Sequence, residues 1–304
     1  MLRKDDHERQ VVIFSLFLLK FILLNKKMYS VNCRGKLIDL SQPRVMGILN
    51  VTPDSFYSES RVAQTDELLR RAEKMIDEGA AFLDVGGYSS RPGAAHIDED
   101  TERRRVIPAV EALHARFPEV AISVDTFRSH IAREAVEAGA CMVNDISGGN
   151  MDSHMFETVA ALKVPYVLMH MKGTPQTMQL NPEYDDVIME LNRFFARRIA
   201  RLHALGVDDI LVDPGFGFGK TLDDNYKILK HLALFKAHDK PILIGISRKS
   251  MLYKYLGGTP ADMLNATTAV HMLALQNGAS VLRVHDVKPA AEAIALFLKY
   301  WEVE

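Results

Sequence analysis

The chain has 304 residues, enough for one large domain or two ordinary ones, and its 48% apolar and 25% charged residues are typical of a soluble globular protein. The net charge of −2 gives no electrostatic reason to bind nucleic acid or an anionic membrane surface. The two cysteines, Cys33 and Cys141, are far apart in the sequence and lack metal-site spacing, which indicates free thiols in a reducing compartment.

The first 27 residues differ from the rest of the chain. Residues 11–24 are apolar except for Ser15 and Lys20. As a helix they would rise about 21 Å, short of the roughly 30 Å core of a bilayer. Charged residues precede this run as in a signal peptide, but no small-residue cleavage site follows it. We expect residues 1–27 to be an extension outside the working fold, with Met28 as a natural start. A membrane anchor and an added packed helix are the alternatives.

A hairpin and then eight strands are predicted from residue 28 onward. Residues 32–40, with Arg34 and Gly35 at the turn, predict a hairpin that closes the bottom of the fold. Short apolar runs follow, as expected for parallel strands covered by helices. These runs are 45–50, 81–86, 120–125, 140–145, 164–170, 210–213, 241–247 and 279–285.

Amphipathic helical patterns separate the apolar runs, and several of them end at a glycine. Eight strand–helix units over about 260 residues predict a (β/α)8 TIM barrel, with residues 28–304 as a single domain. A doubly wound open sheet is the alternative, although its main fingerprint is missing. The predicted helices span 65–78, 99–117, 129–138, 153–162, 184–205, 222–235, 261–276 and 289–301.

The stretch from Asp213 to Lys220, which reads Asp-Pro-Gly-Phe-Gly-Phe-Gly-Lys, looks like a nucleotide loop but matches neither known pattern. A P-loop would need glycine at position 214, which is Pro214. A dinucleotide fingerprint from Gly215 would need its third glycine where Lys220 stands. The glycines still let the backbone approach a ligand closely, so an acid followed by this loop can present Asp213 to a small molecule.

Polar residues end seven of the eight predicted strands, where a TIM barrel builds its active site. For any single residue, capping of the next helix is an alternative explanation. The whole set favours a polar ring around one mouth. Its members are Asn50, Asp84, Asp125, Asn144, Asp145, His170, Asp213, Ser247, Arg248, Lys249, Arg283 and His285.

Three cations near the last two strands predict a phosphate site. Arg283 and His285 are two residues apart on a strand, so both face the same side. Lys249 follows the seventh strand, and the loops after strands seven and eight are the usual phosphate site of this fold. A guanidinium binds phosphate through two hydrogen bonds, and a lysine adds a point charge. A salt bridge to Asp286 or Asp125 is the alternative.

The acids around the same mouth predict a site for a flat ring. Asp125 and Asp213, with Asn144 between them, could hold a heterocycle that offers several N–H donors. In the alternative, one of the two carboxylates pairs with Lys249 and is structural. Asn50 offers an amide oxygen suited to Mg²⁺, and capping of a turn is equally compatible with it.

Seven sequence blocks, in this order, resemble dihydropteroate synthase. One reads Gly-Gly-Tyr-Ser-Ser-Arg-Pro-Gly at 86–93, and another is the 213–220 stretch. The resemblance covers the chain from about Met28 to its end. The blocks span 46–56, 84–93, 124–126, 144–149, 213–220, 247–250 and 283–287.

The resemblance implies an activity and a set of site residues. Members of this family join p-aminobenzoate to 6-hydroxymethyl-7,8-dihydropterin diphosphate and release diphosphate, giving 7,8-dihydropteroate for folate biosynthesis. It also implies Mg²⁺ on Asn50, a homodimer and a cytoplasmic enzyme with no membrane or nucleic-acid partner. The pterin would be held by Asp125, Asn144, Asp213 and Lys249, the diphosphate by Asn50, Arg283 and His285, and p-aminobenzoate by Ser89, Ser90, Arg91, Pro92, Phe218 and Ser250. Catalysis would fall to Lys249, Arg283, His285, Asp125 and Asp213.

Two departures from the family pattern concern the second loop, which usually reads Gly-Gly-Glu-Ser-Thr-Arg-Pro-Gly. Tyr88 replaces the glutamate and Ser90 the threonine, which affects the expected affinity for p-aminobenzoate or sulfonamides rather than the reaction class. A pterin-dependent methyltransferase with the same barrel is an alternative function. A non-catalytic pterin-binding paralogue is another, and it should have lost Arg91, Lys249, Arg283 or His285, which are all present.

Overall fold

The computed structural model describes residues 29–51, 61–89, 96–178 and 182–303, so the predictions for residues 1–27 lie outside it. An antiparallel hairpin is followed by alternating strands and helices. The strands are β1 (Ser30–Cys33), β2 (Lys36–Asp39), β3 (Arg44–Asn50), β4 (Ala80–Gly86), β5 (Ala121–Asp125), β6 (Met142–Asp145), β7 (Tyr166–Met169), β8 (Ile210–Asp213), β9 (Leu243–Ile244) and β10 (Val281–Val284). The helices are α2 (Arg61–Asp77), α3 (Glu99–Arg116), α4 (Ser129–Ala138), α5 (Met155–Leu162), α6 (Val187–Ala204), α7 (Leu222–Lys230), α8 (Ser250–Leu256), α9 (Leu264–Gln276) and α10 (Val287–Glu302), with 3-10 turns η2 (Leu232–His238) and η3 (Pro260–Met263).

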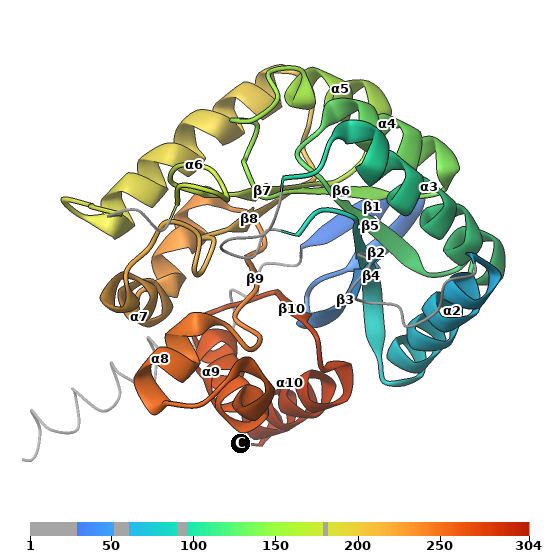
Figure 1. The fold of residues 1–304 in the computed structure, drawn as a ribbon. Coiled ribbons are helices and arrows are strands. Elements are labelled where there is room, and N and C mark those ends of the chain that lie inside the picture. The colour runs from blue at the N-terminus through green and yellow to red at the C-terminus, as the bar shows by residue number, and fades with distance from the viewer. Residues whose placement is uncertain (1–28, 52–60, 90–95, 179–181, 304) are drawn as a thin grey trace, which may run out of the picture.

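Strands β3 to β10 form one parallel sheet that closes on itself. Their order is β8-β7-β6-β5-β4-β3-β10-β9, and a parallel bridge between Val212 and Ile242 joins the two ends. The helices lie outside this ring (Figure 1). The predicted TIM barrel is therefore confirmed.

The interior of the barrel is apolar at one end and polar at the other. Alternate residues of a strand share a face. One residue of each barrel strand, such as Phe82 of β4 and Leu211 of β8, packs in a buried interior cluster. Two residues further along the same face stand Asp84 and Asp213. The intervening Leu83 belongs instead to the core between strands and helices. Strand period alone thus produces an apolar floor beneath a polar mouth.

The β1–β2 hairpin closes the apolar end, as predicted. Val31, Cys33 and Leu40 pack into the interior cluster. The backbone N–H of Asn32 donates to Asp209 Oδ2 at 3.1 Å, which ties the hairpin to the residue just before β8. Because this end is plugged, the site must open at the carboxyl ends of the strands.

Two helical segments differ from their predicted form. The helix expected over 222–235 is α7 followed by the separate 3-10 turn η2. Helix α8 was not predicted, because its seven residues are too few to show a helical period. No helix in the described ranges is both long and apolar enough to cross a membrane.

Candidate active site

Arg283 occupies the centre of the mouth, between two carboxylates. Its Nε donates to Asp84 Oδ2 at 2.6 Å and its Nη2 to Asp125 Oδ2 at 2.5 Å. Burial alone would lower the pKa of Arg283, but the charges of Asp84 and Asp125 outweigh it and raise the pKa above its usual value. The salt bridge to Asp125, which sequence left as an alternative to phosphate binding, is thus present in this structure.

Asp84 was predicted to belong to the polar ring at the strand ends, but no role could be assigned to it from the sequence. It is fully buried, and its Oδ2 also accepts the amide of Asn144 at 2.9 Å. It therefore links β4 to β6 on one side and to β10 on the other. The signal was available, since Asp84 stands in the same strand-end register as the predicted residues.

Of the two acids predicted to bind a flat ring, Asp213 is buried and Asp125 is partly buried. Asp125 ends β5 and pairs in register with Asn144 of β6, while Asp213 ends β8. Burial raises the pKa of Asp125 to about 7 against the opposing charge of Arg283. Burial also raises the pKa of Asp213, and the charge of Lys249 counters this. One oxygen of Asp213 already accepts the Gly215 N–H at 2.7 Å, so the other is the oxygen available to a ligand.

Lys249 projects from the loop after β9 towards the loop after the neighbouring strand β8. Its Nζ donates to the carbonyl of Phe216 at 2.5 Å and lies 4.5 Å from the centre of the Phe218 ring. Burial lowers the pKa of Lys249 to about 8, although the charge of Asp213 works in the opposite direction. The Lys249 ammonium therefore lies between Asp213, which is predicted to hold a flat heterocycle, and the aromatic ring of Phe218.

Arg248 fixes the backbone from which Lys249 projects. It adopts a left-handed conformation, with φ of 55°, that non-glycine residues rarely take. Its guanidinium donates to both oxygens of Asp286, at 2.7 and 3.0 Å. Its backbone N–H donates to Thr267 Oγ1 at 3.0 Å. These contacts hold an otherwise unfavourable turn, and Arg248, rather than Arg283, makes the salt bridge to Asp286.

His285 lies beside Ser247 at the last strand. The His285 backbone N–H donates to Ser247 Oγ at 3.2 Å, and this hydroxyl lies 3.1 Å from His285 Nδ1. Because the Ser247 hydroxyl accepts from the His285 backbone N–H, we assign it as the donor to His285 Nδ1. The neutral ring then carries its N–H on Nε2. A neutral His285 can thus still donate to an anion through Nε2.

Asn50 ends β3, in register with Gly86, the ladder partner of Asp125. Within the described residues, no group of three or more His, Cys, Asp or Glu could hold a metal ion. Mg²⁺ commonly takes one or two protein ligands and completes its shell with substrate phosphates and water. The single hard oxygen of Asn50 fits that mode of binding.

An apolar half of the mouth adjoins Lys249. Phe218 packs with Tyr88 and Met169 in a cluster of its own, separate from the barrel floor. Of the residues predicted to bind p-aminobenzoate, Ser89 follows β4 and Ser250 begins α8, both partly buried. Ser90, Arg91 and Pro92 lie outside the described residues. Of that predicted set, Phe218 belongs to the aromatic cluster, while Ser89 and Ser250 directly follow Tyr88 and Lys249 in the sequence.

Tyr88, the departure from the family pattern, is buried and hydrogen-bonded. Its ring meets Phe127 edge-on at 5.1 Å. Its hydroxyl accepts from Gln176 Nε2 at 2.7 Å and lies 3.1 Å from His96 Nδ1. Tyr88 thus joins the loop after β4 to the loop after β7.

Two residues of the predicted ring face away from the mouth. His170 follows the inward-facing Met169 and packs edge-on against Phe194 at 4.9 Å. Asp145 follows Asn144, and its carboxylate accepts from the Tyr166 hydroxyl at 2.7 Å. The prediction that these two belong to the polar ring is wrong, because strand alternation turns each of them outward.

Lys220 is also structural. Its Nζ lies 3.1 Å from His170 Nδ1 and donates to the carbonyls of His170 and Phe218 at 3.2 and 3.0 Å. Burial lowers the pKa of His170 to about 2, so its ring is neutral and Nδ1 can accept. Burial also lowers the pKa of Lys220 to about 7, and in its charged form the three protons of the ammonium have three acceptors. Lys220 ties the glycine-rich loop to β7 and holds Phe218 in place.

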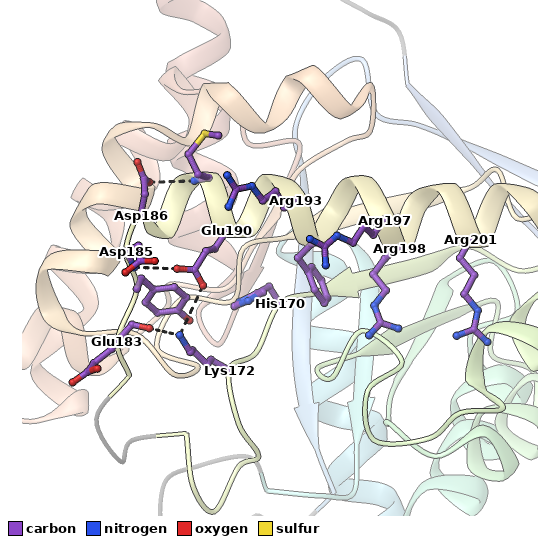
Figure 2. A pocket seen from close by; sticks show the side chains of 13 residues that line it. His170, Lys172, Glu183, Asp185, Asp186, Glu190, Arg193, Arg197, Arg198 and Arg201 are labelled. Atoms are coloured by element: carbon purple, nitrogen blue, oxygen red, sulfur yellow. Dashed lines mark hydrogen bonds and ion pairs between the residues drawn. The ribbon is translucent and has the colours of Figure 1, made fainter.

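A groove of about 1520 Å³ runs along α6, outside the barrel. Figure 2 shows Arg193, Arg197, Arg198 and Arg201 following one another along this helix. None of the residues predicted to bind substrates lines it. The groove is therefore separate from the candidate active site.

A family model described as pterin binding enzyme matches residues 46–285, and the chain belongs to this family. The more particular resemblance to dihydropteroate synthase is confirmed. That enzyme from Escherichia coli strain K12 is 46% identical over 263 residues, covering 86% of this chain and 93% of the relative. The solved Yersinia pestis dihydropteroate synthase with a sulfonamide drug is 42% identical, with a TM-score of 0.85 over 90% of this chain and 100% of that one. The Xanthomonas albilineans enzyme in complex with 7,8-dihydropteroate is 38% identical, with a TM-score of 0.82 over 91% and 100%.

Proposed function

We propose that this chain is a dihydropteroate synthase, which condenses 6-hydroxymethyl-7,8-dihydropterin diphosphate with p-aminobenzoate. The observation that carries the proposal is one mouth with three parts. The carboxylates of Asp125 and Asp213 can accept hydrogen bonds from a pterin, and the amide of Asn144 can accept or donate them. Arg283 and Lys249 can bind an anion beside it. The aromatic wall around Phe218 adjoins both parts.

The residues of the mouth suit an alkyl transfer with diphosphate as the leaving group. Departure of diphosphate leaves positive charge on the pterin methylene, which the carboxylates of Asp125 and Asp213 stabilise. Arg283 and His285 donate to the leaving oxygens, whose negative charge grows in the transition state. The attacking aromatic amine has a free lone pair at neutral pH. The protein therefore needs to orient it rather than deprotonate it first.

Mg²⁺ is proposed as the metal, held by Asn50 together with oxygens of the diphosphate. Bound there, it would neutralise charge on the leaving group. Removal of Mg²⁺ with a chelator should lower turnover and weaken binding of the pterin diphosphate. Asn50→Ala should reproduce both effects, and it should leave binding of the pterin without diphosphate unchanged.

The direct test combines the protein with both substrates and Mg²⁺ and measures dihydropteroate. Lys249→Ala should abolish product formation while circular dichroism and Tm show an intact fold. Near-normal turnover by this variant would overturn the assignment. Methyl transfer from methyltetrahydrofolate to a corrinoid protein, without dihydropteroate formation, would favour the methyltransferase alternative. Pterin binding without either reaction would favour the non-catalytic paralogue.

We propose a homodimer in the cytoplasm. Large apolar side chains are exposed on η2, α8, α9 and α10, the last two of which pack together. They include Leu234, Tyr255, Leu273, Leu296 and Tyr300, each at least half exposed. Such a surface is typical of one that is covered by a second copy. Light scattering should give twice the chain mass. A monomer at micromolar concentration would contradict the dimer without affecting the activity.

A further inference from the structure

The two carboxylates that hold Arg283 lie at different depths. Asp84 is completely buried, whereas the Asp125 side chain keeps 15% of its surface exposed. Asp125 pairs in register with Gly86, two residues nearer the mouth than Asp84. A ligand entering the mouth therefore meets the Asp125 side of the guanidinium, while Asp84 holds it from below.

Asp84 holds two site residues through one oxygen. Its Oδ2 accepts from Arg283 Nε at 2.6 Å and from Asn144 Nδ2 at 2.9 Å, which uses both lone pairs. In the described part of the chain, its Oδ1 and the hydroxyl of its register neighbour Ser123 are both buried without a hydrogen-bond partner. The carboxylate is thus oriented by the two site residues alone.

The proposed function requires an exchange at this centre. It assigns Asp125 to the pterin and Arg283 to the diphosphate, yet these two side chains are bound to each other. We infer that Asp84 is a positioning residue that keeps Arg283 by Nε and Asn144 by its amide while Arg283 Nη2 passes from Asp125 to the diphosphate. This inference rests on the proposed function.

The exchange leaves no charge unpaired. Nη2 trades a carboxylate oxygen for a phosphate oxygen, and both are anionic acceptors. The freed Asp125 oxygen then accepts an N–H of the pterin. Leaving Asp125 buried and unpaired would be costly, so the pterin and its diphosphate help each other to bind. Before substrate binds, Arg283 and Asp125 thus pair with each other, Arg283 in place of the pterin and Asp125 in place of the diphosphate. We call this pair the placeholder.

The test measures, by calorimetry, how much the diphosphate improves pterin binding. Kd is determined for the pterin diphosphate and for the same pterin as a free alcohol, both with Mg²⁺. In Asp84→Asn, the neutral amide anchors Arg283 less firmly, and the gain from the diphosphate should fall about tenfold. In Asp125→Asn, Arg283 no longer leaves a carboxylate, and the gain should rise although the free pterin binds less tightly.

The opposite shifts distinguish this inference from simpler explanations. If the carboxylates only neutralised Arg283, both variants would bind the diphosphate better. If Asp84 only stabilised the fold, both ligands would weaken equally. Either result would overturn the inference. Ser123→Ala is the matched control, since it removes a buried neighbouring hydroxyl that makes no hydrogen bond to Arg283 or Asn144, and it should leave both Kd values unchanged.

The outcomes also separate the inference from the proposed function. A wild-type protein that forms dihydropteroate, combined with an unchanged or increased gain in Asp84→Asn, would overturn the inference alone. A wild-type protein that binds neither pterin would overturn both. Thermal unfolding of each variant checks that the fold persists. Should Asp84→Asn fail to fold, an unchanged or reduced gain in Asp125→Asn still refutes the placeholder.

Discussion

Replacement of Lys249 by methionine should abolish activity and make the protein more stable. Lys249 is partly buried at the mouth, and burial lowers its pKa from the usual 10.5 to about 8. A shift of that size corresponds to roughly 3 kcal/mol by which the folded state disfavours the charged lysine. That figure already contains the attraction of Asp213. Methionine has a similar length and carries no charge, so it removes this cost.

The gain is offset by one lost hydrogen bond. Lys249 Nζ donates to the carbonyl of Phe216, whose side chain is fully buried. Leaving that carbonyl without its partner costs about 1–2 kcal/mol. The net gain is then about 1–2 kcal/mol, or about 2–4 °C in Tm for a chain of this size. The charged Lys249 therefore lowers the stability of the folded protein, and the reaction is what requires this charge.

The pH dependence of this gain gives the assay. The folded state binds the Lys249 proton less tightly than the unfolded chain, because the folded pKa is the lower one. The destabilisation of wild type is therefore full below about pH 8 and disappears as pH rises from about 8 towards 10.5. Urea unfolding of wild type and Lys249→Met at several pH values measures the difference directly. A variant less stable than wild type at pH 7, or a difference that does not shrink at alkaline pH, would refute the reasoning.

Further predictions concern titration, the aromatic wall and the extension. The kcat/KM for pterin diphosphate should rise near pH 7 as Asp125 ionises and fall above about pH 8 as Lys249 loses its proton, giving a bell-shaped steady-state profile. Phe218→Ala should raise KM for p-aminobenzoate several-fold and leave that of the pterin diphosphate unchanged; equal effects on both would contradict the assigned wall. Tyr88→Phe should keep the ring packing and raise the same KM less, as measured alongside it. Protein expressed from Met28 should retain full activity and solubility, and loss of either would show that residues 1–27 contribute to the working protein.

Most of what could be predicted from the sequence came from the apolar strand runs and the polar residues at their ends. Eight apolar runs, seven of which end in polar residues, predicted the barrel and the side on which its site opens. The same reasoning misplaced His170, because the run over 164–169 that precedes it is continuously apolar and does not reveal which alternate residues face inward. Asp145 was misplaced for a related reason, since adjacent polar residues must face opposite sides.

Contacts across the barrel interior could not be predicted. The sequence offered both phosphate binding and a salt bridge for Arg283, and nothing in it fixes the distance between β10 and β5. The role of Asp84 depends on the same missing information, because it contacts strands on both sides of its own. The turn at Arg248 could not be foreseen either, since its left-handed backbone depends on contacts with the distant Asp286 and Thr267.

The hairpin that closes the apolar end of the barrel carries a buried thiol, whose reactivity can report local opening. Cys33 on the hairpin and Cys141 just before β6 are both free and buried. A hydrogen bond with Cys141 and burial together raise the pKa of the Cys33 thiol, which makes it a poor nucleophile while the hairpin is closed. A thiol reagent can therefore label Cys33 only when the hairpin detaches. The rate of labelling, compared with the rate of global unfolding, would measure how often the floor of the barrel opens while its mouth remains assembled.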